Sequence, residues 1–524
     1  MRIGTPREIC AGEARVAMTP DSAAHLQKLG HTCLIESGAG LLAGFTDDTY
    51  RGAGVEIIES ATELFRSADV IAKVRPPEPN EIDSIDAGKT MISFFYPGQN
   101  DALLARATDR GVNVIAMDLV PRISRAQKMD ALSSMANISG YRAVIEAGSN
   151  FGRFFTGQVT AAGKVPPAKV LVIGAGVAGL AAIGTATSLG AITYAFDVRP
   201  EVAEQIESMG AEFVFLDFGD QQQDGAATGG YATPSSPEFR QKQLDTFRSL
   251  APKIDIVITT ALIPGRDAPK LWLADMVAMM KPGSVVVDLA AERGGNCELT
   301  VEGTRIVSSN GVVVIGYTDF PSRMATQSST LYATNIRHML ADLTPARDGS
   351  LVHNMEDDVI RGATVAYEGA VTFPPPPPKV QAIAVQKPKQ KPKEPSPEER
   401  RQREVAAFRA QTRSQVALLA FATLLLLVAG AYAPASFMNH LIVFALSCFI
   451  GFQVIWNVSH ALHTPLMAVT NAVSGIVVLG ALLQIGSASI PVTILASIAV
   501  LISTINIIGG FFVTRRMLAM FQKS

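Results

Sequence analysis

The sequence predicts two α/β domains built on parallel sheets, followed by a linker and a four-helix transmembrane segment. Three observations support this fold class. Short apolar runs alternate with helical-period stretches through the first three-quarters of the chain, a proline- and lysine-rich segment follows, and Ser414 to Thr514 contains no Asp, Glu, Lys or Arg. At 524 residues the chain is also too long for one ordinary domain.

The apolar runs have the length, and the Gly and Asp boundaries, of strands buried on both faces of a sheet. Their alternation with helices is typical of βαβ units. The runs are too many for one sheet, so two α/β domains are expected. The runs are Cys33–Ile35, Val70–Val74, Met91–Phe95, Val112–Met117, Val170–Ile173, Ile192–Phe196, Ile254–Thr259, Val285–Leu289 and Val312–Ile315.

The boundary between these domains is expected within Leu132–Gly163, a stretch with the pattern of one long helix. The first domain would comprise residues 1–131 and the second residues 132–327. The helical stretch Ser328–Leu343 would then return to the first domain, which would also include about residues 328–373.

Residues 374–413 are predicted to form a disordered linker. Five consecutive prolines, Pro374–Pro378, open a segment rich in Lys, Glu and further prolines, and such a composition stays extended and solvated. A Pro-rich docking motif is the alternative interpretation.

Residues 414–524 are predicted to form a transmembrane domain, because spanning a bilayer takes about 20 apolar residues. Basic residues flank the first and last spans and favour the cytoplasmic side, so both termini and the N-terminal domains are expected in the cytoplasm. The predicted spans are Val416–Tyr432, Leu441–Val458, Leu466–Leu483 and Ile490–Val513, with breaks at Pro434–His440, Ser459–Pro465 and Gly486–Ser489.

Composition argues against several other functions. A net charge of −2 and a pI near 6.4 give no reason to expect nucleic acid as a partner. The four cysteines show no CxxC spacing, which argues against a disulfide framework or a zinc site. We interpret all four as small core hydrophobes in a reducing compartment.

The strongest motif is a glycine pattern between an apolar strand and an apolar helix. A lone GxGxxG is weak evidence, but this context makes it specific for a dinucleotide site of the Rossmann-like, doubly wound kind. Gly174 would permit a tight turn, Gly176 would leave room for a pyrophosphate, and Gly179 would let the helix pack close to the strand. The helix N-terminus would attract the phosphates. The motif reads Gly174-Ala175-Gly176-Val177-Ala178-Gly179.

The next strand, Ile192–Phe196, ends at Asp197, with Val198 and Arg199 following. An acid at this place would accept hydrogen bonds from ribose hydroxyls and would repel a 2′-phosphate, which predicts NAD over NADP. Arg199 lies close by and weakens that preference slightly. A second glycine pattern, Gly38–Gly44, is followed by polar, turn-like residues and is interpreted as a turn.

Several segments resemble a known family. Arg2–Glu8, Arg15–Pro20 and Gly174–Gly179 are similar to both alanine dehydrogenase and the NAD-binding part of proton-translocating NAD(P) transhydrogenase. Pro121–Ser134 and Val454–Met467 resemble the transhydrogenase version specifically. The resemblance covers nearly the whole chain except the linker, and indicates the alpha-subunit family of the bacterial two-subunit enzyme.

The resemblance implies roles at matching positions. Arg122, Gln127, Asp130 and Ser133 would form the loop that holds the dihydronicotinamide and its ribose. Tyr231 would belong to a mobile loop that closes over the nucleotide, with Gly230 beside it. Leu262 would add apolar contacts near the adenosine, and Ala175, Val177, Val198 and Arg199 would line the rest of the site.

The resemblance also implies an assembly. NAD(H) would bind on this chain and NADP(H) on a partner beta subunit, with direct hydride transfer between them coupled to proton translocation. The NAD-binding part would form a homodimer within an alpha2beta2 complex, and the four helices would contact lipid in the bacterial inner membrane. Because the spans contain no Asp, Glu or Lys, the main proton path is expected on the partner, and His460 and His463 are interpreted as interfacial.

A membrane-tethered, alanine-type dehydrogenase is the alternative function. Alanine dehydrogenases use an Arg, a Lys and a catalytic His on the first domain. Arg15 and Lys73 match the first two, but Phe94–Asn100 contains no His. Without that acid/base group the amino-acid chemistry loses its proton carrier, and Arg15 and Lys73 are interpreted as scaffold. A non-catalytic NAD sensor is a third possibility.

Overall fold

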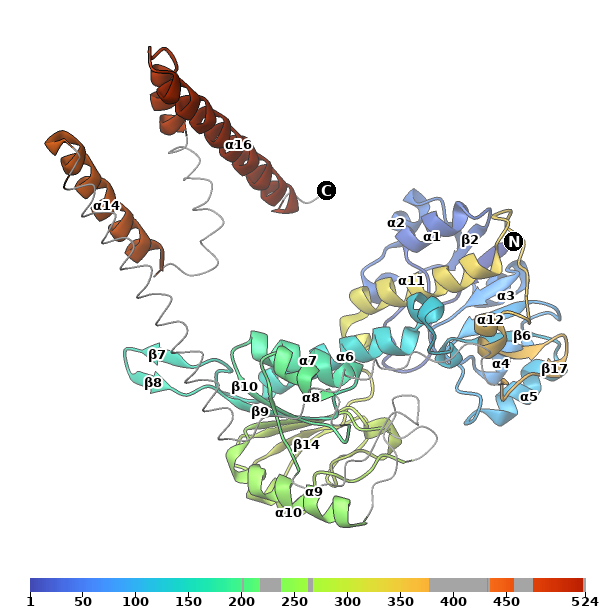
Figure 1. The fold of residues 1–524 in the computed structure, drawn as a ribbon. Helices are drawn as coiled ribbons and strands as arrows, with labels where there is room; N and C mark the ends of the chain where they lie inside the picture. The colour runs from blue at the N-terminus through green and yellow to red at the C-terminus, as the bar shows by residue number, and fades with distance from the viewer. Residues whose placement is uncertain are drawn as a thin grey trace. The chain divides into compact units, whose positions relative to one another are not determined.

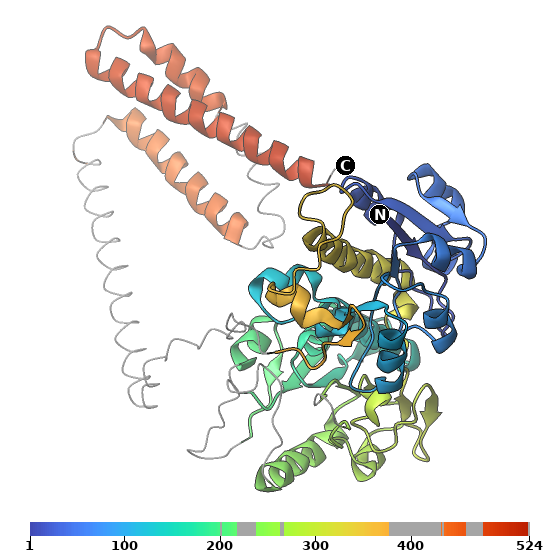
Figure 2. The same ribbon diagram turned by 90° about the vertical axis from the view of Figure 1, so that its right-hand side faces the viewer.

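The computed structural model describes residues 1–199, 202–216, 237–262, 267–376, 431, 434–456 and 475–521. The chain divides into two compact units, Met1–Lys391 and Pro392–Ser524 (Figures 1 and 2). The N-terminal unit contains two large sheets, and the described part of the C-terminal unit is helical.

The first sheet has eight strands in the order β17-β16-β6-β5-β4-β1-β2-β3. β1 to β6 are parallel, whereas β16 pairs antiparallel with β6, and β17 pairs antiparallel with β16. The strand order reverses between β1 and β4, which makes this the topological switch point. The strands are β1 (Arg2–Thr5), β2 (Thr32–Glu36), β3 (Glu56–Ile58), β4 (Val70–Ala72), β5 (Thr90–Ser93), β6 (Asn113–Ala116), β16 (Thr364–Tyr367) and β17 (Ala370–Val371).

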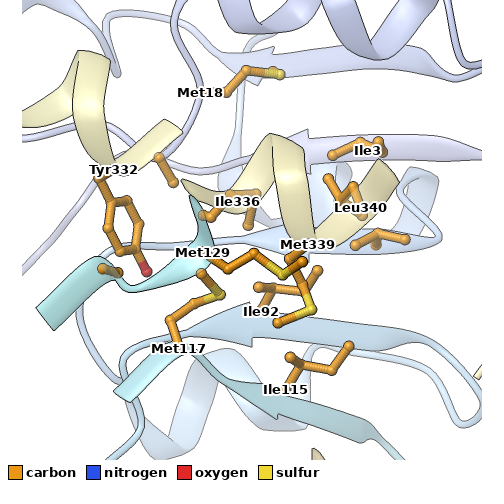
Figure 3. Close-up of a cluster of buried hydrophobic side chains, with 14 of the residues drawn as sticks. Ile3, Met18, Ile92, Ile115, Met117, Met129, Tyr332, Ile336, Met339 and Leu340 are labelled. Carbon is orange, nitrogen blue, oxygen red and sulfur yellow. The ribbon is translucent and has the colours of Figure 1, made fainter. Parts of the chain in front are cut away.

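A helix from much later in the chain covers one face of this sheet (Figure 3). Tyr332, Ile336 and Met339 of α11 pack with Ile92 and Ile115 of the sheet in one buried cluster. The helices around the first sheet are α1 (Pro20–Gln27), α2 (Asp47–Gly52), α3 (Ala61–Ser67), α4 (Pro79–Asp83), α5 (Asp101–Asp109), α11 (Ala325–Leu343) and α12 (Asp358–Ala363), with short 3₁₀ helices η1 (Leu41–Ala43), η2 (Met117–Leu119) and η3 (Ser124–Met129).

The second sheet has seven strands in the order β11-β10-β9-β12-β13-β15-β14. All pairs are parallel except β14 with β15. The order reverses between β9 and β12, so the carboxyl ends of these two strands flank the crevice where doubly wound sheets bind ligands. The strands are β9 (Lys169–Ile173), β10 (Ile192–Phe196), β11 (Glu212–Phe213), β12 (Ile256–Thr259), β13 (Val285–Asp288), β14 (Arg305–Val307) and β15 (Val313–Ile315).

Two helices of the second sheet touch backbone to backbone. A Cβ on Gly140 of α6 would lie 1.9 Å from the carbonyl oxygen of Ala178 in α7, so only glycine fits at this crossing. The helices around this sheet are α6 (Ala131–Asn150), α7 (Val177–Ser188), α8 (Ala203–Ser208), α9 (Pro237–Leu250) and α10 (Ala274–Met279), with 3₁₀ helices η6 (Ala251–Lys253), η7 (Ala291–Arg293) and η8 (Ser322–Met324).

The predicted fold class is confirmed, since every predicted apolar run of the N-terminal unit forms a strand. The sheets are parallel as predicted, except that antiparallel strands are added at their edges. β14 and β15 are joined by a short connection, and β16 and β17 by a shorter one, and short connections force neighbouring strands to run antiparallel. The domain limits at residues 131, 327 and 373 remain predictions.

The prediction that Leu132–Gly163 is one helix is wrong in its second half. α6 ends at Asn150, and Gly152 has a φ of +51°, a conformation that ends a helix and that glycine adopts without strain. β7 (Gln158–Thr160) and β8 (Gly163–Val165) then form a small antiparallel hairpin (Figure 1).

The cysteine interpretation is half right. Cys33 and Cys297 are buried, and burial raises their pKa values to about 12 and about 11, so both thiols are protonated and inert at neutral pH. Cys10 and Cys448 are exposed, which the pattern of isolated cysteines could not indicate. Within the described ranges, no cluster of three or more His, Cys, Asp or Glu side chains could hold a metal ion.

The C-terminal unit has helices α14 (Ala435–Trp456), Gly475–Ile485 and α16 (Ile490–Phe521) among its described residues. Of these, the segment Ile490–Gly509 is long and apolar enough to cross a membrane. Its mean hydropathy is 2.2 and only 6% of it is buried inside the structure. This length and composition fit a helix that spans a bilayer.

The predicted breaks between spans have mixed outcomes. The break at Gly486–Ser489 is confirmed, because the chain leaves helical conformation there. The break at Pro434–His440 is shorter than predicted: Pro434 is not helical, but α14 starts directly after it, where a proline's missing N–H costs nothing. The following predicted features lie outside the described residues: most of the linker, most of the first span, the third span up to residue 474, and His460 and His463.

Candidate functional site

The glycine turn between β9 and α7 has two glycines that the protein's own packing requires. Gly174 has a φ of +99°, and a Cβ there would lie 2.4 Å from Thr260 Oγ1. A Cβ on Gly179 would lie 1.8 Å from the carbonyl oxygen of Gly174. These contacts match the tight turn and the close helix–strand packing that the motif predicts.

Gly176 differs, because no atom lies within 4 Å of the place where its Cβ would be. It is the exposed N-cap of the twelve-residue helix α7, at the switch point of the sheet. Internal packing therefore does not explain this glycine. The open space beside the backbone, at a helix N-terminus with unpaired N–H groups, fits an anionic pyrophosphate.

The end of β12 completes the crevice. The Thr260 N–H donates to the carbonyl oxygen of Ile173 (2.9 Å), and Thr260 Oγ1 donates to that of Gly174 (3.1 Å). Thr260, which follows the neighbouring strand β12, therefore holds the glycine turn in place through two hydrogen bonds. Leu262, two residues later, is 44% exposed at the rim, where an apolar side chain can contact a ligand.

A fully buried amide and carboxylate support this rim. Asn296 Oδ1 accepts from the Ala261 N–H (3.0 Å), and Asn296 Nδ2 donates to the Ala261 carbonyl (2.8 Å). Asp288 accepts hydrogen bonds from two hydroxyls and two backbone N–H groups. The sequence reasoning missed Thr260, Asn296 and Asp288. The rule that ligands bind where strands flanking the switch point end could have identified Thr260.

Asp197 is engaged by protein donors. It is 8% exposed, and its carboxylate accepts from the Ala175 N–H (2.7 Å) and from the Arg199 backbone N–H (2.9 Å). The Arg199 guanidinium donates to both carboxylate oxygens, each at 2.9 Å. Asp197 therefore stands beside the glycine turn as predicted, with its charge balanced by Arg199. A ribose hydroxyl would have to share this carboxylate with the guanidinium.

The other residues of the predicted nucleotide site differ in exposure. Val177 at the start of α7 is 42% exposed, Val198 is half-buried, and Ala175 is buried. Tyr231 and Gly230 lie outside the described residues.

The predicted nicotinamide loop follows β6 and η2 of the first sheet and leads into α6. Asp130 is the N-cap of α6: its Oδ1 accepts from the Ser133 N–H (2.9 Å), and the Ser133 hydroxyl donates to Oδ2 (2.5 Å). Gln127 lies on η3 and is exposed, as is Arg122 before it. Asp130 and Ser133 are thus brought together directly by helix capping.

Helix α6 connects this loop to the glycine turn. Gly140, where α6 touches Ala178 of α7, lies ten residues after Asp130, or about 15 Å along the helix axis. The two groups of predicted site residues are therefore held at a fixed spacing by two helices in backbone contact.

The switch point of the first sheet is filled by buried ion pairs. Arg15 is 4% exposed and donates to both oxygens of the fully buried Glu13 (2.7 and 2.6 Å). Burial would raise the pKa of Glu13, but the hydrogen bonds and charge of Arg15 outweigh it and hold that pKa at about 2.

Lys73 is similarly enclosed. It is 1% exposed, with Nζ 2.7 Å from Glu81 Oε1 and 3.5 Å from Glu8 Oε2. Burial would lower the pKa of Lys73, but the two carboxylates raise it above its ordinary value. Both cations of this switch point are thus balanced by protein carboxylates, which supports their interpretation as scaffold.

Comparison with known proteins gives a consistent family. Residues 4–139 match the N-terminal domain and residues 143–374 the C-terminal domain of the alanine dehydrogenase/PNT family. Residues 440–523 match the 4TM region of pyridine nucleotide transhydrogenase.

Individual relatives agree with this family. The chain is 74% identical to the NAD(P) transhydrogenase subunit alpha of Cereibacter sphaeroides, over the full length of both chains. It is 30% identical to the alanine dehydrogenase of Bacillus subtilis, over 71% of this chain and 93% of that protein. The crystal structure of transhydrogenase from Sinorhizobium meliloti superposes with a TM-score of 0.64 at 40% identity, covering 71% of this chain and 100% of that one.

Proposed function

This chain belongs to the alanine dehydrogenase/pyridine nucleotide transhydrogenase family, and from that membership we propose that it is the NAD(H)-binding subunit of a proton-translocating NAD(P)⁺ transhydrogenase. It is an alpha-type subunit of an oxidoreductase and a membrane protein, since the match to an alpha subunit is full-length and includes the 4TM region. The proposal concerns which nucleotide it binds and what reaction follows.

The observation that carries the proposal is the open glycine at the switch point of the second sheet. Gly174 and Gly179 are required by internal contacts, whereas Gly176 faces open space at the N-terminus of α7. A dinucleotide pyrophosphate binds close to the backbone at a helix N-terminus, and a glycine there has no side chain to block that approach. Bound there, NADH supplies the hydride.

The preference for NAD rests on Asp197. Asp197 directly follows β10, and its carboxylate would repel a 2′-phosphate, while Arg199 balances part of that charge. We therefore expect NADH to bind more tightly than NADPH, by a smaller margin than an unpaired acid would give.

Hydride transfer between two nicotinamides requires contact and orientation, and no general acid or base. This chain's part is to hold the nicotinamide end through the loop that includes Arg122, Gln127, Asp130 and Ser133. The Asp130–Ser133 pair fixes the loop to the first turn of α6. α6 in turn is fixed to α7, which begins at the glycine turn.

A beta-type partner would supply the NADP(H) site. Because Ser414 to Thr514 contains no Asp, Glu, Lys or Arg, we assign the main proton path to that partner as well. We place the assembly in the bacterial inner membrane, with the N-terminal unit in the cytoplasm, as an alpha2beta2 complex containing a homodimer of the NAD-binding part.

The test is reconstitution. The purified chain, combined with a beta-type partner in lipid vesicles, should reduce a thio-NADP⁺ analogue at the expense of NADH, with proton movement reported by a pH-sensitive dye. Neither subunit alone should do so. Full activity of this chain without the partner would refute the division of nucleotides between the subunits.

The alanine-type dehydrogenase is less well supported. Its substrate would need free cations at the switch point of the first sheet, where Arg15 and Lys73 are already paired with buried carboxylates. Turnover of alanine with NAD⁺, or of pyruvate and ammonia with NADH, by this chain alone would favour the alternative.

Asp130→Ala should slow hydride transfer in the reconstituted complex roughly 10-fold or more, because the loop loses its anchor to α6 and the nicotinamide its fixed position. Loss of the N-cap should also cost about 1 kcal/mol of stability. Ser60→Ala, which removes the N-cap of α3, is the matched control for stability. An Asp130→Ala complex with the wild-type rate would contradict the role of this loop.

A further inference from the structure

The 3₁₀ helix η3 arranges its side chains on three distinct faces. A 3₁₀ helix has three residues per turn, so side chains three apart in sequence lie above one another. Along Ser124–Met129 and its flanks, one face is apolar (Ile123, Ala126, Met129), one is basic (Arg125, Lys128) and one is polar (Ser124, Gln127, Asp130).

The apolar face is buried against the first sheet. Ile123 is 5% exposed, and Ala126 and Met129 are fully buried. Met129 belongs to the cluster that includes Ile336 and Met339 of α11 (Figure 3). Burial of this face turns it toward the sheet and sets how deep η3 sits, and the directional polar contacts of the other faces then hold that rotation.

The basic face forms ion pairs with two carboxylates from distant parts of the chain. Asp342 of α11 accepts from Arg125 Nη1 (3.1 Å) and from Lys128 Nζ (2.8 Å), so one carboxylate bridges two successive turns. Arg125 also pairs with Asp357, the N-cap of α12. Asn335 of α11 adds a hydrogen bond to the Lys128 carbonyl (3.0 Å).

The anchoring carboxylates are the less exposed partners. Asp342 and Asp357 are 16% and 22% exposed, against 48% for Arg125 and 42% for Lys128. Burial would raise the pKa of Asp357, but hydrogen bonds from Arg125 and from two backbone N–H groups outweigh this and lower it. Both anchors are therefore held by packed helices, whereas the cations are carried by the loop.

With two faces fixed, the third is the one left to a ligand. Ser124 and Gln127 are exposed, and Asp130 is half-buried as the N-cap of α6. This is the face that includes two of the residues assigned above to the nicotinamide. Its direction depends on the rotation of η3, and the only directional contacts that fix this rotation from α11 are those of Asp342 and Asn335 among the described residues.

We propose that Asp342 is a positioning residue for hydride transfer: by bridging Arg125 and Lys128 it holds the rotation of η3, and so the aim of Gln127 at the nicotinamide. This inference rests on the proposed function. Asp342 touches no substrate itself. Loosening it should affect the nicotinamide end of the bound nucleotide and leave the adenosine end, on the second sheet, unchanged.

The experiment uses the full chain reconstituted with its beta-type partner in vesicles. Asp342→Asn removes the charge that holds both cations and should lower kcat for reduction of thio-NADP⁺ roughly 10- to 100-fold, as expected when a reacting group is misplaced by about 1 Å. The Kd for 5′-AMP, which has no nicotinamide, should stay within about twofold of wild type. Asp342→Glu keeps the charge and should recover part of kcat.

Asp255→Asn is the matched control. Asp255 also bridges two cations, Arg153 (2.9 Å) and Lys281 (3.4 Å), but at the start of β12, the end of the sheet opposite the glycine turn. Thermal unfolding of both variants shows how much each bridge stabilises the fold. The control should keep wild-type kcat even if its stability falls.

The outcomes separate this inference from the proposed function. A wild-type kcat in Asp342→Asn, with Gln127→Ala strongly impaired, would overturn the inference alone. Equal loss of kcat in Asp342→Asn and Asp255→Asn, or weaker 5′-AMP binding in Asp342→Asn, would show a structural role only and would also overturn it. If wild-type complex fails to transfer hydride, or Gln127→Ala has no effect, the proposed function itself fails.

Discussion

Gly179→Ala is expected to weaken NADH binding by this chain severely. The new methyl group would lie 1.8 Å from the Gly174 carbonyl oxygen, so α7 must move away from the turn that cradles the pyrophosphate. Alanine favours helix by about 1 kcal/mol over glycine, but overpacking against backbone costs about 1–3 kcal/mol or more. Isothermal titration should show affinity weakened at least roughly 100-fold, and thermal unfolding should shift downwards.

Gly176→Ala distinguishes an effect on ligand binding from an effect on internal packing. No atom lies within 4 Å of its Cβ position, so stability should stay at the wild-type level while NADH affinity falls. Gly52→Ala, at an equally open position in α2 of the first sheet, should change neither property. Unchanged NADH affinity in Gly179→Ala or in Gly176→Ala would contradict the assignment of the turn.

Lys73→Met is expected to destabilise the first sheet strongly. The substitution leaves Glu8 and Glu81, 3% and 7% exposed, without their shared cation. Removing one partner of a buried ion pair costs about 3–5 kcal/mol. Labelling of the buried Cys33 by a maleimide in increasing urea reports unfolding of this sheet, since its thiol, with a pKa of about 12, is inert while folded.

The control for this prediction is Lys89→Met. Its carboxylate partner, Asp86, is 66% exposed and can be solvated when the cation is removed, so the urea midpoint of Cys33 labelling should move much less. Without urea and at low temperature, where the Lys73→Met variant is folded, its complex with the partner should retain hydride transfer. Loss of transfer by a fully folded variant would mean that Lys73 touches substrate, and would strengthen the dehydrogenase alternative.

Local patterns in the sequence predicted the parts of the molecule that depend on neighbouring residues. The run Val170–Ile173, the glycine motif and Asp197 fall within one βαβ unit, and their spacing alone indicates a strand, a turn and a helix N-terminus. Gly176 was predicted to leave space, and it borders open space in the structure.

Long-range pairings could not be predicted in this way. Asp342 and Asp357 lie more than 200 residues from Arg125 in the sequence, and nothing in their local context indicates the contact. The Leu132–Gly163 error arose because helix periodicity was extended past Gly152, whose positive φ requires tertiary structure to establish.

The two switch points share a topology but differ in the residues that occupy them. Both sheets have the same doubly wound order around their switch points. In the second sheet the turn consists of small residues, and no atom lies within 4 Å of the place where a Cβ of Gly176 would be. In the first, Arg15 and Lys73 are buried and paired with carboxylates. Among the described residues, the second crevice is the one that combines an open glycine with a helix N-terminus.

The most direct test of the central claim is titration of the purified full-length chain, in detergent and without its partner, with NADH and with NADPH. The glycine turn and Asp197 predict saturable NADH binding at one site per chain, with NADPH at least roughly 10-fold weaker, or about 1.4 kcal/mol. Gly176→Ala should weaken that binding while thermal unfolding is unchanged. Equal or tighter NADPH binding, or NADH affinity that Gly176→Ala leaves unchanged, would contradict the account.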